Sequence, residues 1–410
     1  MKTPKNNWTP QQYQSIFDYY RLNFDPNFEV YSRNLIKLRA KETQLITDEK
    51  EVMVMSELKT PRKTFILNRG SYDAPSTEVS YGVINRILPF DDNLPKNRLG
   101  LAQWLLDERN PLFLRVVVNR FWQNYFGYGL SKSVDDFGNQ GEMPSHPELL
   151  DWLATQFRAS NWDVKAMQKL IVMSATYQQS SFKRQDLMEN DAENRLLARG
   201  PSYRYSHEQI RDAVLEGSGL LVHKIGGPSV YPYQPAGIWE ALATRNATSY
   251  KQNHGDSLYR RGLYTIWKRS SPPPSAITFD TPERYFCVIK RQKTSTPLQS
   301  LVMMNDPQYN EAARKLAERM MREGGSTPEG RITLAYKAME SRYPRKEEVR
   351  ILKEMYQEEL SDIQKNPKRV KELLSIGESQ IDKSLNQNEL AANTILAMTL
   401  INFDGTVIKR

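Results

Sequence analysis

Six polar side chains, five of them capable of acid–base or nucleophilic chemistry, lie within thirteen residues of one stretch. They are Asp136, Gln140, Glu142, Ser145, His146 and Glu148. A serine, a histidine and a carboxylate can form a nucleophilic hydrolase site, and carboxylates beside a histidine can carry general acid–base catalysis. We therefore take Asp136, Glu142 and His146 as candidate catalytic residues and Gln140 as a candidate ligand-binding residue.

Ser145 is better explained as a helix cap than as a nucleophile. In "PSHPELLDWL" it stands just before an apolar-periodic run, with Glu148 three residues later, which is the capping-box pattern. The stretch "SHEQIRDAV" repeats the pattern with Ser206 and Gln209. A nucleophilic serine usually needs a strained Gly-x-Ser-x-Gly elbow, and the sequence has none. We predict structural caps at all four positions.

A polar face interrupts the apolar helix predicted for "LFLRVVVNRFWQNYFG". Arg115 and Asn119 are four residues apart and therefore share this face. We expect both to hydrogen-bond an adjoining loop, with Asp136 as the partner of Arg115. Both are also candidate ligand-binding residues.

The segment 260–291 is basic and rich in hydroxyl groups, as in "KRSSPPPSAITFDTPER". Arg284 and Arg291 are its candidate ligand-binding residues, because guanidinium groups pair well with sulfate and carboxylate. Two interpretations stay open for this segment: a surface that binds an acidic polymer, and a solvated loop.

Charge and composition narrow the class of partner. The chain has 410 residues and a net charge of +9, but its basic residues are interleaved with acidic ones. That pattern is typical of solvated helix faces, and no nucleic-acid-binding motif accompanies it, so we expect no nucleic-acid partner. No apolar run approaches the roughly 18 residues that span a bilayer, so we expect no transmembrane segment.

Cysteine and histidine usage limits the cofactors. Cys287 is the only cysteine, which excludes an intrachain disulfide, a cysteine-rich zinc site and a Cys-x-x-Cys-His haem attachment. With only four histidines in the chain, we predict no metal site and no cofactor. The first residues lack the pattern of a signal peptide, so we expect the chain to be a piece of a longer protein.

The periodicity of the sequence predicts a mainly α fold. Helices are expected over 9–50, from 97 to 221 and from 297 onward, whereas "EVMVMSEL" and "KTFILNRG" alternate as strands and form a small β element near 50–70. Residues 224–300 are dense in Gly, Pro and Ser, with one short strand expected at 263–268. We predict a helical and β-hairpin arm at 1–95, either a linker or the end of a preceding domain, and a multi-helix domain at 96–410 with an irregular insertion at 224–300.

Several segments, in order, resemble a known family. They are "NRLGLAQWLLDERNPLFLRVVVNRFWQNYFGYGL", "NWDVKAMQKLIVMSATYQQSS", "GGPSV" and "TSTPLQSLVMMNDP". Together they resemble the C-terminal domain of planctomycete cytochrome c-associated proteins, a domain of unknown function. The resemblance implies an extracytoplasmic protein whose haem is carried only by a separate N-terminal domain. It also implies two possible partners, that haem domain and a sulfatase-like protein of neighbouring genes.

These observations leave three hypotheses of function open. The leading one is a non-catalytic, extracytoplasmic docking module for a partner protein or an extracellular polymer. The first alternative is an enzyme that acts on an extracellular polysaccharide, or an oxidative component with the haem domain as electron acceptor, with its acid–base groups in the loop from Asp136 to His146. The second is an acidic-polymer binder that uses the basic segment 260–291.

Overall fold

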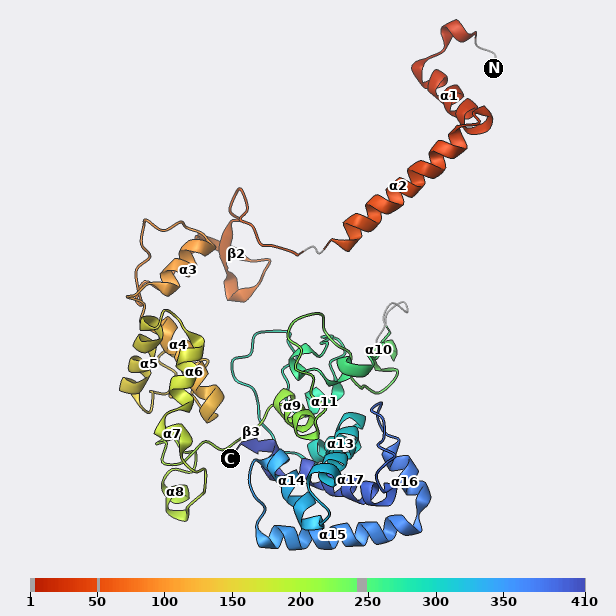
Figure 1. The fold of residues 1–410 in the computed structure, drawn as a ribbon. Coiled ribbons are helices and arrows are strands. Elements are labelled where there is room, and N and C mark those ends of the chain that lie inside the picture. The colour runs from red at the N-terminus through yellow and green to blue at the C-terminus, as the bar shows by residue number, and fades with distance from the viewer. Residues whose placement is uncertain (1–3, 50–51, 242–248, 410) are drawn as a thin grey trace. The chain divides into compact units, whose positions relative to one another are not determined.

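The chain folds mainly into α-helices, as the sequence predicts (Figure 1). A computed structural model describes residues 4–49, 52–241 and 249–409. In this part of the chain, strands form only two small two-stranded sheets. The chain divides into two compact units, one comprising the residues up to Ile84 together with Phe90–Ala102, and the other comprising Asn85–Pro89 and the residues from Gln103 onward.

The first unit contains two helices and one hairpin. Its elements are α1 (Pro10–Phe24), α2 (Phe28–Asp48), β1 (Thr64–Leu67) and β2 (Pro75–Val79). Helix α1 begins with a capping box in which Thr9 and Gln12 exchange hydrogen bonds, because the first amides of a helix have no partner within it. Helix α3 (Arg98–Leu106) follows and continues into the second unit.

The predicted strand pairing near residues 50–70 is wrong in one partner. Strand β1 lies inside the predicted strand 63–70, but it pairs with β2, and residues 52–58 form no strand. The turn after β1 sets this pairing. The Asn68 amide donates to the Ala74 carbonyl at 3.0 Å, and this bond closes a hairpin between β1 and the residues that follow it. Residue 51 lies outside the described residues.

The second unit begins with a small helical bundle. Its helices are α4 (Leu112–Phe126), α5 (Pro147–Ala159) and α6 (Val164–Val172), followed by the short α7 (Ala175–Gln178) and α8 (Gln185–Asn190). Val118, Trp122, Leu150 and Phe157 are buried between the three longer helices. Gly127 ends α4 with a φ of 84°, a left-handed conformation that glycine adopts without a steric penalty.

The larger core of the second unit surrounds α13. The helices are α9 (His207–Ser218), α12 (Pro297–Asn305), α13 (Pro307–Glu323), α14 (Pro328–Glu340), α15 (Lys346–Lys365), α16 (Pro367–Leu374), α17 (Gln387–Ile401) and α18 (Asp404–Val407). Leu316 and Met320 of α13 are completely buried in this core. Strand β3 (Tyr203–Arg204) pairs antiparallel with β4 (Ile408–Lys409). The sequence predicts the helices after residue 297 with the exception of α16 and α18.

The described part of the segment 224–300, residues 224–241 and 249–300, is irregular, as predicted, and specific contacts hold part of it. It holds α10 (Ile238–Ala241), α11 (Pro274–Thr278) and two short 3₁₀ helices (Gly255–Tyr259, Gly262–Tyr264). The strand expected at 263–268 is reduced to a single bridge at Thr265. Arg211 of α9 donates to the carbonyls of Arg260 and Leu258 at 2.6 and 2.7 Å. A buried guanidinium therefore supplies the hydrogen bonds that a strand partner would otherwise provide.

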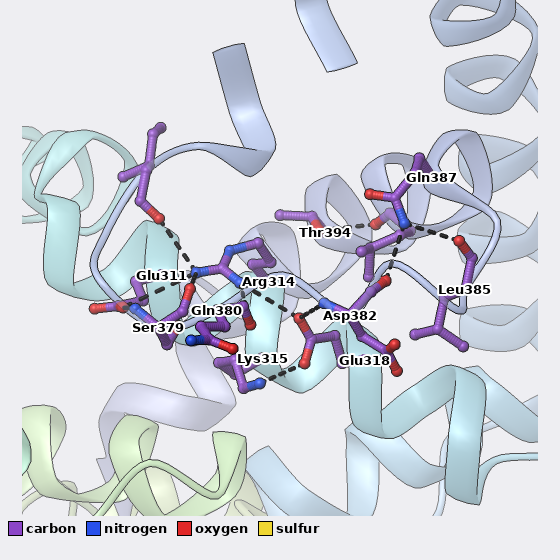
Figure 2. Close-up of polar contacts among 12 residues, drawn as sticks. Glu311, Arg314, Lys315, Glu318, Ser379, Gln380, Asp382, Leu385, Gln387 and Thr394 are labelled. Carbon is purple, nitrogen blue, oxygen red and sulfur yellow. Dashed lines mark hydrogen bonds and ion pairs between the residues drawn. The ribbon is translucent and has the colours of Figure 1, made fainter. Parts of the chain in front are cut away.

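Buried charges on α13 hold the loop between α16 and α17 (Figure 2). Arg314 donates to the carbonyl and hydroxyl oxygens of Ser379 at 2.7 and 2.8 Å and pairs with Glu318 at 3.3 Å. Glu311 accepts from the Ser379 amide at 2.5 Å. At Gly377, a Cβ would come within 2.4 Å of the Glu311 side chain, so only glycine fits there without displacing Glu311. This set of residues is called the α13 network below.

Candidate binding pocket

A pocket opens where the starts of α9 and α13 meet the irregular segment. Its cavity volume is about 30 Å³, so it admits a small polar group of a larger ligand. Its polar lining includes His207, Arg211, Gln234, Asp306, Gln308 and Tyr309. We call it the histidine pocket.

Four of these residues bring buried polar atoms to the pocket with no hydrogen-bond partner in the described part of the chain. The atoms are His207 Nδ1, Gln234 Nε2, Gln308 Nε2 and Tyr309 Oη. A buried polar group without a partner costs about 1–3 kcal/mol, and folded proteins rarely keep several together. Such a cluster is therefore typical of a site that a polar ligand completes.

The orientation of Gln308 follows from its neighbour. Arg211 Nη2 donates to Gln308 Oε1 at 3.0 Å, and a guanidinium has only donors, so the oxygen of the amide must face it. The amide nitrogen of Gln308 is then left as the group without a partner. The backbone N–H of Gln308 donates to Asp306 Oδ1 at 2.9 Å, which also helps to fix the position of this residue.

Burial sets the charges in the histidine pocket. It lowers the pKa of His207 to about 4, so the imidazole is neutral at pH 7. Burial raises the pKa of Asp306, although the backbone amide of Gln308 and the charge of Arg211 oppose it. Burial also raises the pKa of Tyr309, so this hydroxyl keeps its proton. At neutral pH, the charges of Arg211 and Asp306 offset each other, and the pocket suits an uncharged polar group.

Aromatic and proline side chains complete the wall. Pro232, Tyr233, Tyr250 and Pro273 line the pocket. The hydroxyl of Tyr233 donates to Glu311 of the α13 network at 3.0 Å, and that of Tyr250 donates to the Pro232 carbonyl at 2.5 Å. With these hydroxyls engaged elsewhere, the two tyrosines contribute apolar ring surface to the pocket.

The residues predicted as catalytic lie in the loop before α5 and do not line the histidine pocket. Asp136 Oδ1 accepts from the Gly138 amide at 2.7 Å, so this carboxylate stabilises its own loop. Gln140 and Glu142 are exposed, and His146 Nδ1 lies 3.0 Å from Ser145 Oγ. The catalytic role of this loop stays a prediction.

Two contacts predicted around α5 are wrong. Arg115 pairs with Asp151 of α5, at 2.5 and 2.8 Å, instead of Asp136. The N-cap of α5 is His146, and no side-chain cap hydrogen bond forms there, so Ser145 and Glu148 are not a capping box. The amide and hydroxyl of Ser145 instead donate to the Leu130 carbonyl, at 2.9 and 3.3 Å. The helix therefore begins one residue later than the sequence predicts.

Two other predictions are confirmed. Ser206 and Gln209 form the capping box of α9. Asn119 exchanges two hydrogen bonds of 3.0 Å with the backbone of Ser131, in the loop that follows α4. Its side chain is completely buried, so Asn119 is a structural residue that fixes this loop.

The two candidate arginines of the basic segment both have partners. Arg284 lies over the ring of Trp267, with Cζ 4.5 Å from the ring centroid. Arg291 pairs with Glu208 of α9 at 2.8 Å. Neither arginine lines the histidine pocket, and Arg291 borders a second pocket that is described below.

The sequence analysis missed the residues of the histidine pocket. Gln234 comes from the irregular segment, and the other polar residues named above come from "SHEQIRDAV" and "NDPQYN", which are far apart in the chain and which the periodicity predicts only as parts of helices. A usable signal was present, because His207, Arg211 and Gln308 are polar residues at positions that face the core of amphipathic helices.

Fold and pocket together define a mainly α-helical protein with a concave polar site. A model of the PSD1 family, described as a protein of unknown function (DUF1553), matches residues 97–356. The match spans more than half of the chain, so the chain belongs to this family, and the resemblance to a domain of unknown function is confirmed. No curated protein and no solved structure shows a significant match to the chain.

Two further properties concern membranes and metals. None of the described helices combines the length and the apolar character that a membrane crossing requires. Within residues 4–49, 52–241 and 249–409, no three His, Cys, Asp or Glu side chains gather in a way that could hold a metal ion.

Proposed function

We propose that the chain is an extracytoplasmic docking module that binds a hydroxyl-bearing unit of an extracellular polysaccharide in the histidine pocket. One observation carries the proposal: four residues that line this pocket each hold a buried polar atom with no hydrogen-bond partner in the described part of the chain. The resemblance to cytochrome c-associated proteins supports the extracytoplasmic location. It also makes a haem domain of the full-length protein and a sulfatase-like protein the expected partners.

The chemistry of the pocket favours a sugar over an apolar ligand. The amide nitrogens of Gln234 and Gln308 are donors, and the carboxylate of Asp306 is an acceptor. A sugar hydroxyl both donates and accepts, so neighbouring hydroxyls of one ring can serve both kinds of group. The rings of Tyr233 and Tyr250 offer apolar surface for the C–H face of that sugar.

Removing single polar groups from the pocket tests the proposal. We expect Tyr309→Phe and Gln234→Leu each to weaken binding to the best polysaccharide of an array about two- to tenfold, because each removes one hydrogen bond. Dissociation constants of the intact chain for that polysaccharide provide the measurement. Tyr343→Phe is the matched control, since Tyr343 is 69% exposed and lies outside the pocket. Unchanged affinity in both pocket variants would reject the site.

Catalysis on the bound sugar is the second candidate function. The observation that favours it is the pairing of a neutral histidine with a carboxyl of raised pKa in one pocket, a combination that is common in acid–base sites. Release of new reducing ends in the binding assay identifies it. Asp306→Asn should then abolish that release and preserve binding.

A further inference from the structure

A second pocket adjoins the histidine pocket at the start of α9. Its cavity volume is about 20 Å³. Its lining includes Arg204, Phe279, Asp280, Arg291, Lys293 and Gln299. We call it the basic pocket.

Positive charge dominates the lining of the basic pocket. Three of the lining residues are cationic, and Asp280 is the acidic one. Both carboxylate oxygens of Asp280 are already engaged, because they accept from the amide and hydroxyl of Thr294 at 2.7 to 3.0 Å. Asp280 therefore anchors the segment that carries Lys293, and Arg291 is paired with Glu208, so Arg204 and Lys293 are the cations left for a ligand.

Two buried polar atoms of the basic pocket lack partners in the described part of the chain. They are Arg204 Nε and Gln299 Oε1. Gln299 is completely buried, and its amide nitrogen donates to the Thr278 carbonyl at 3.0 Å, which fixes its oxygen as the unused group. Arg204 is held by Ser295 at 3.4 Å through Nη1, so its Nε stays available for another acceptor. The pocket thus offers a charged donor and a neutral acceptor.

The poor solvation of the cations also favours an anionic ligand. Burial lowers the pKa of Lys293 and of Arg204, which means that their positive charges are poorly solvated in the free protein. The contact found for Lys293 is with the ring of Tyr203, whose centroid lies 4.1 Å from Nζ. An anion in the pocket would compensate both charges.

We propose that the basic pocket binds an anionic substituent, carboxylate or sulfate, of the same polysaccharide whose hydroxyl-bearing ring occupies the histidine pocket. This inference rests on the proposed function. The acceptor of Gln299 favours a sugar acid or sugar sulfate over a free inorganic anion, because it requires a hydroxyl donor next to the anionic group.

The two pockets are close enough for one ligand. Ser206 lines the basic pocket, and its neighbour His207 lines the histidine pocket. The ring of Phe279, at the wall of the basic pocket, lies 5.8 Å from the ring of His207 and 6.0 Å from Arg204 Cζ. The linings of the two pockets are therefore separated by a single layer of side chains, and a ligand lying over that layer can place one group in each pocket.

Pairs of polysaccharides that differ only in charge test the inference. The probes are dextran with dextran sulfate, and methyl-esterified polygalacturonate with free polygalacturonate, each titrated against the intact chain. We expect a sulfated or carboxylated member to bind more tightly than its neutral counterpart. Arg204→Gln and Lys293→Gln should each reduce this advantage about ten- to hundredfold, since each removes a charge-assisted contact. Lys290→Gln, an exposed residue that does not line the pocket, is the matched control.

The outcomes separate this inference from the proposed function. Neutral dextran binding that depends on Tyr309, without any advantage of charge, overturns the basic pocket alone. An advantage of charge that persists in both variants also overturns it. Binding of none of the four polymers, or binding that is indifferent to Tyr309 and Gln234, overturns the proposed function as well.

Discussion

Arg314→Ala should lower the free energy of unfolding of the second unit by about 3–5 kcal/mol, measured by urea denaturation. Arg314 is 1% exposed, and its removal leaves the completely buried Glu311 without its paired cation, whereas Glu318 keeps Lys315. It also removes the hydrogen bonds to Ser379 that hold the loop between α16 and α17 (Figure 2). Since domains have about 5–15 kcal/mol of stability, this single change is a large fraction of the total.

Arg350 provides a closely matched control. It pairs with Glu347 and Glu354, three residues before and four residues after it, the same spacing that Arg314 has to Glu311 and Glu318. Arg350 and its partners are more than half exposed, however, so Arg350→Ala should cost less than about 1 kcal/mol. Equal losses in the two variants would show that burial of the α13 network contributes nothing.

His207 should make the protein less stable in acid. Its pKa is about 4 in the folded chain and 6.5 when unperturbed, so between these values the unfolded chain binds the extra proton. Stability is therefore complete above about pH 6.5 and falls as the pH drops to about 4, by about 3 kcal/mol in total. The measurement is the free energy of unfolding at several pH values between 7 and 4.

A His207→Gln variant isolates this contribution. The carboxyls of Asp306 and Asp212 have raised pKa values, so the folded chain holds their protons more firmly and gains stability as the pH falls. These opposing contributions are common to both proteins. The difference in stability between wild type and variant should therefore shrink by about 3 kcal/mol from pH 7 to pH 4. A difference that is independent of pH would refute a buried neutral imidazole.

Local sequence patterns predict the helices well, because periodicity and caps act over a few residues. The capping box at Ser206 follows from its own sequence and is confirmed. The similar pattern at Ser145 fails, since the Ser145 amide, from which Glu148 would have to accept, donates instead to the Leu130 carbonyl, fifteen residues away. The hairpin at β1 fails for a related reason: alternation marks a strand but does not identify its partner.

The pocket is harder to predict because it depends on contacts between distant segments. His207 and Tyr309 are 102 positions apart, and they meet only after α9 packs against α13. Arg211 holds the irregular segment beside the pocket by donating to the backbone carbonyls of residues 258 and 260. Every residue has a backbone carbonyl, so the sequence does not mark these contacts. The six polar side chains within 136–148, by contrast, are conspicuous in the sequence. Asp136 and Ser145, however, hydrogen-bond backbone groups of Gly138 and Leu130.

The central claim is that the histidine pocket binds a sugar, and a crystal structure of the chain with the oligosaccharide selected by the array tests it most directly. The account predicts sugar oxygens within hydrogen-bond distance, about 2.7–3.2 Å, of Gln308 Nε2 and Tyr309 Oη. It is contradicted by a sugar bound at another face while ordered water alone satisfies these atoms.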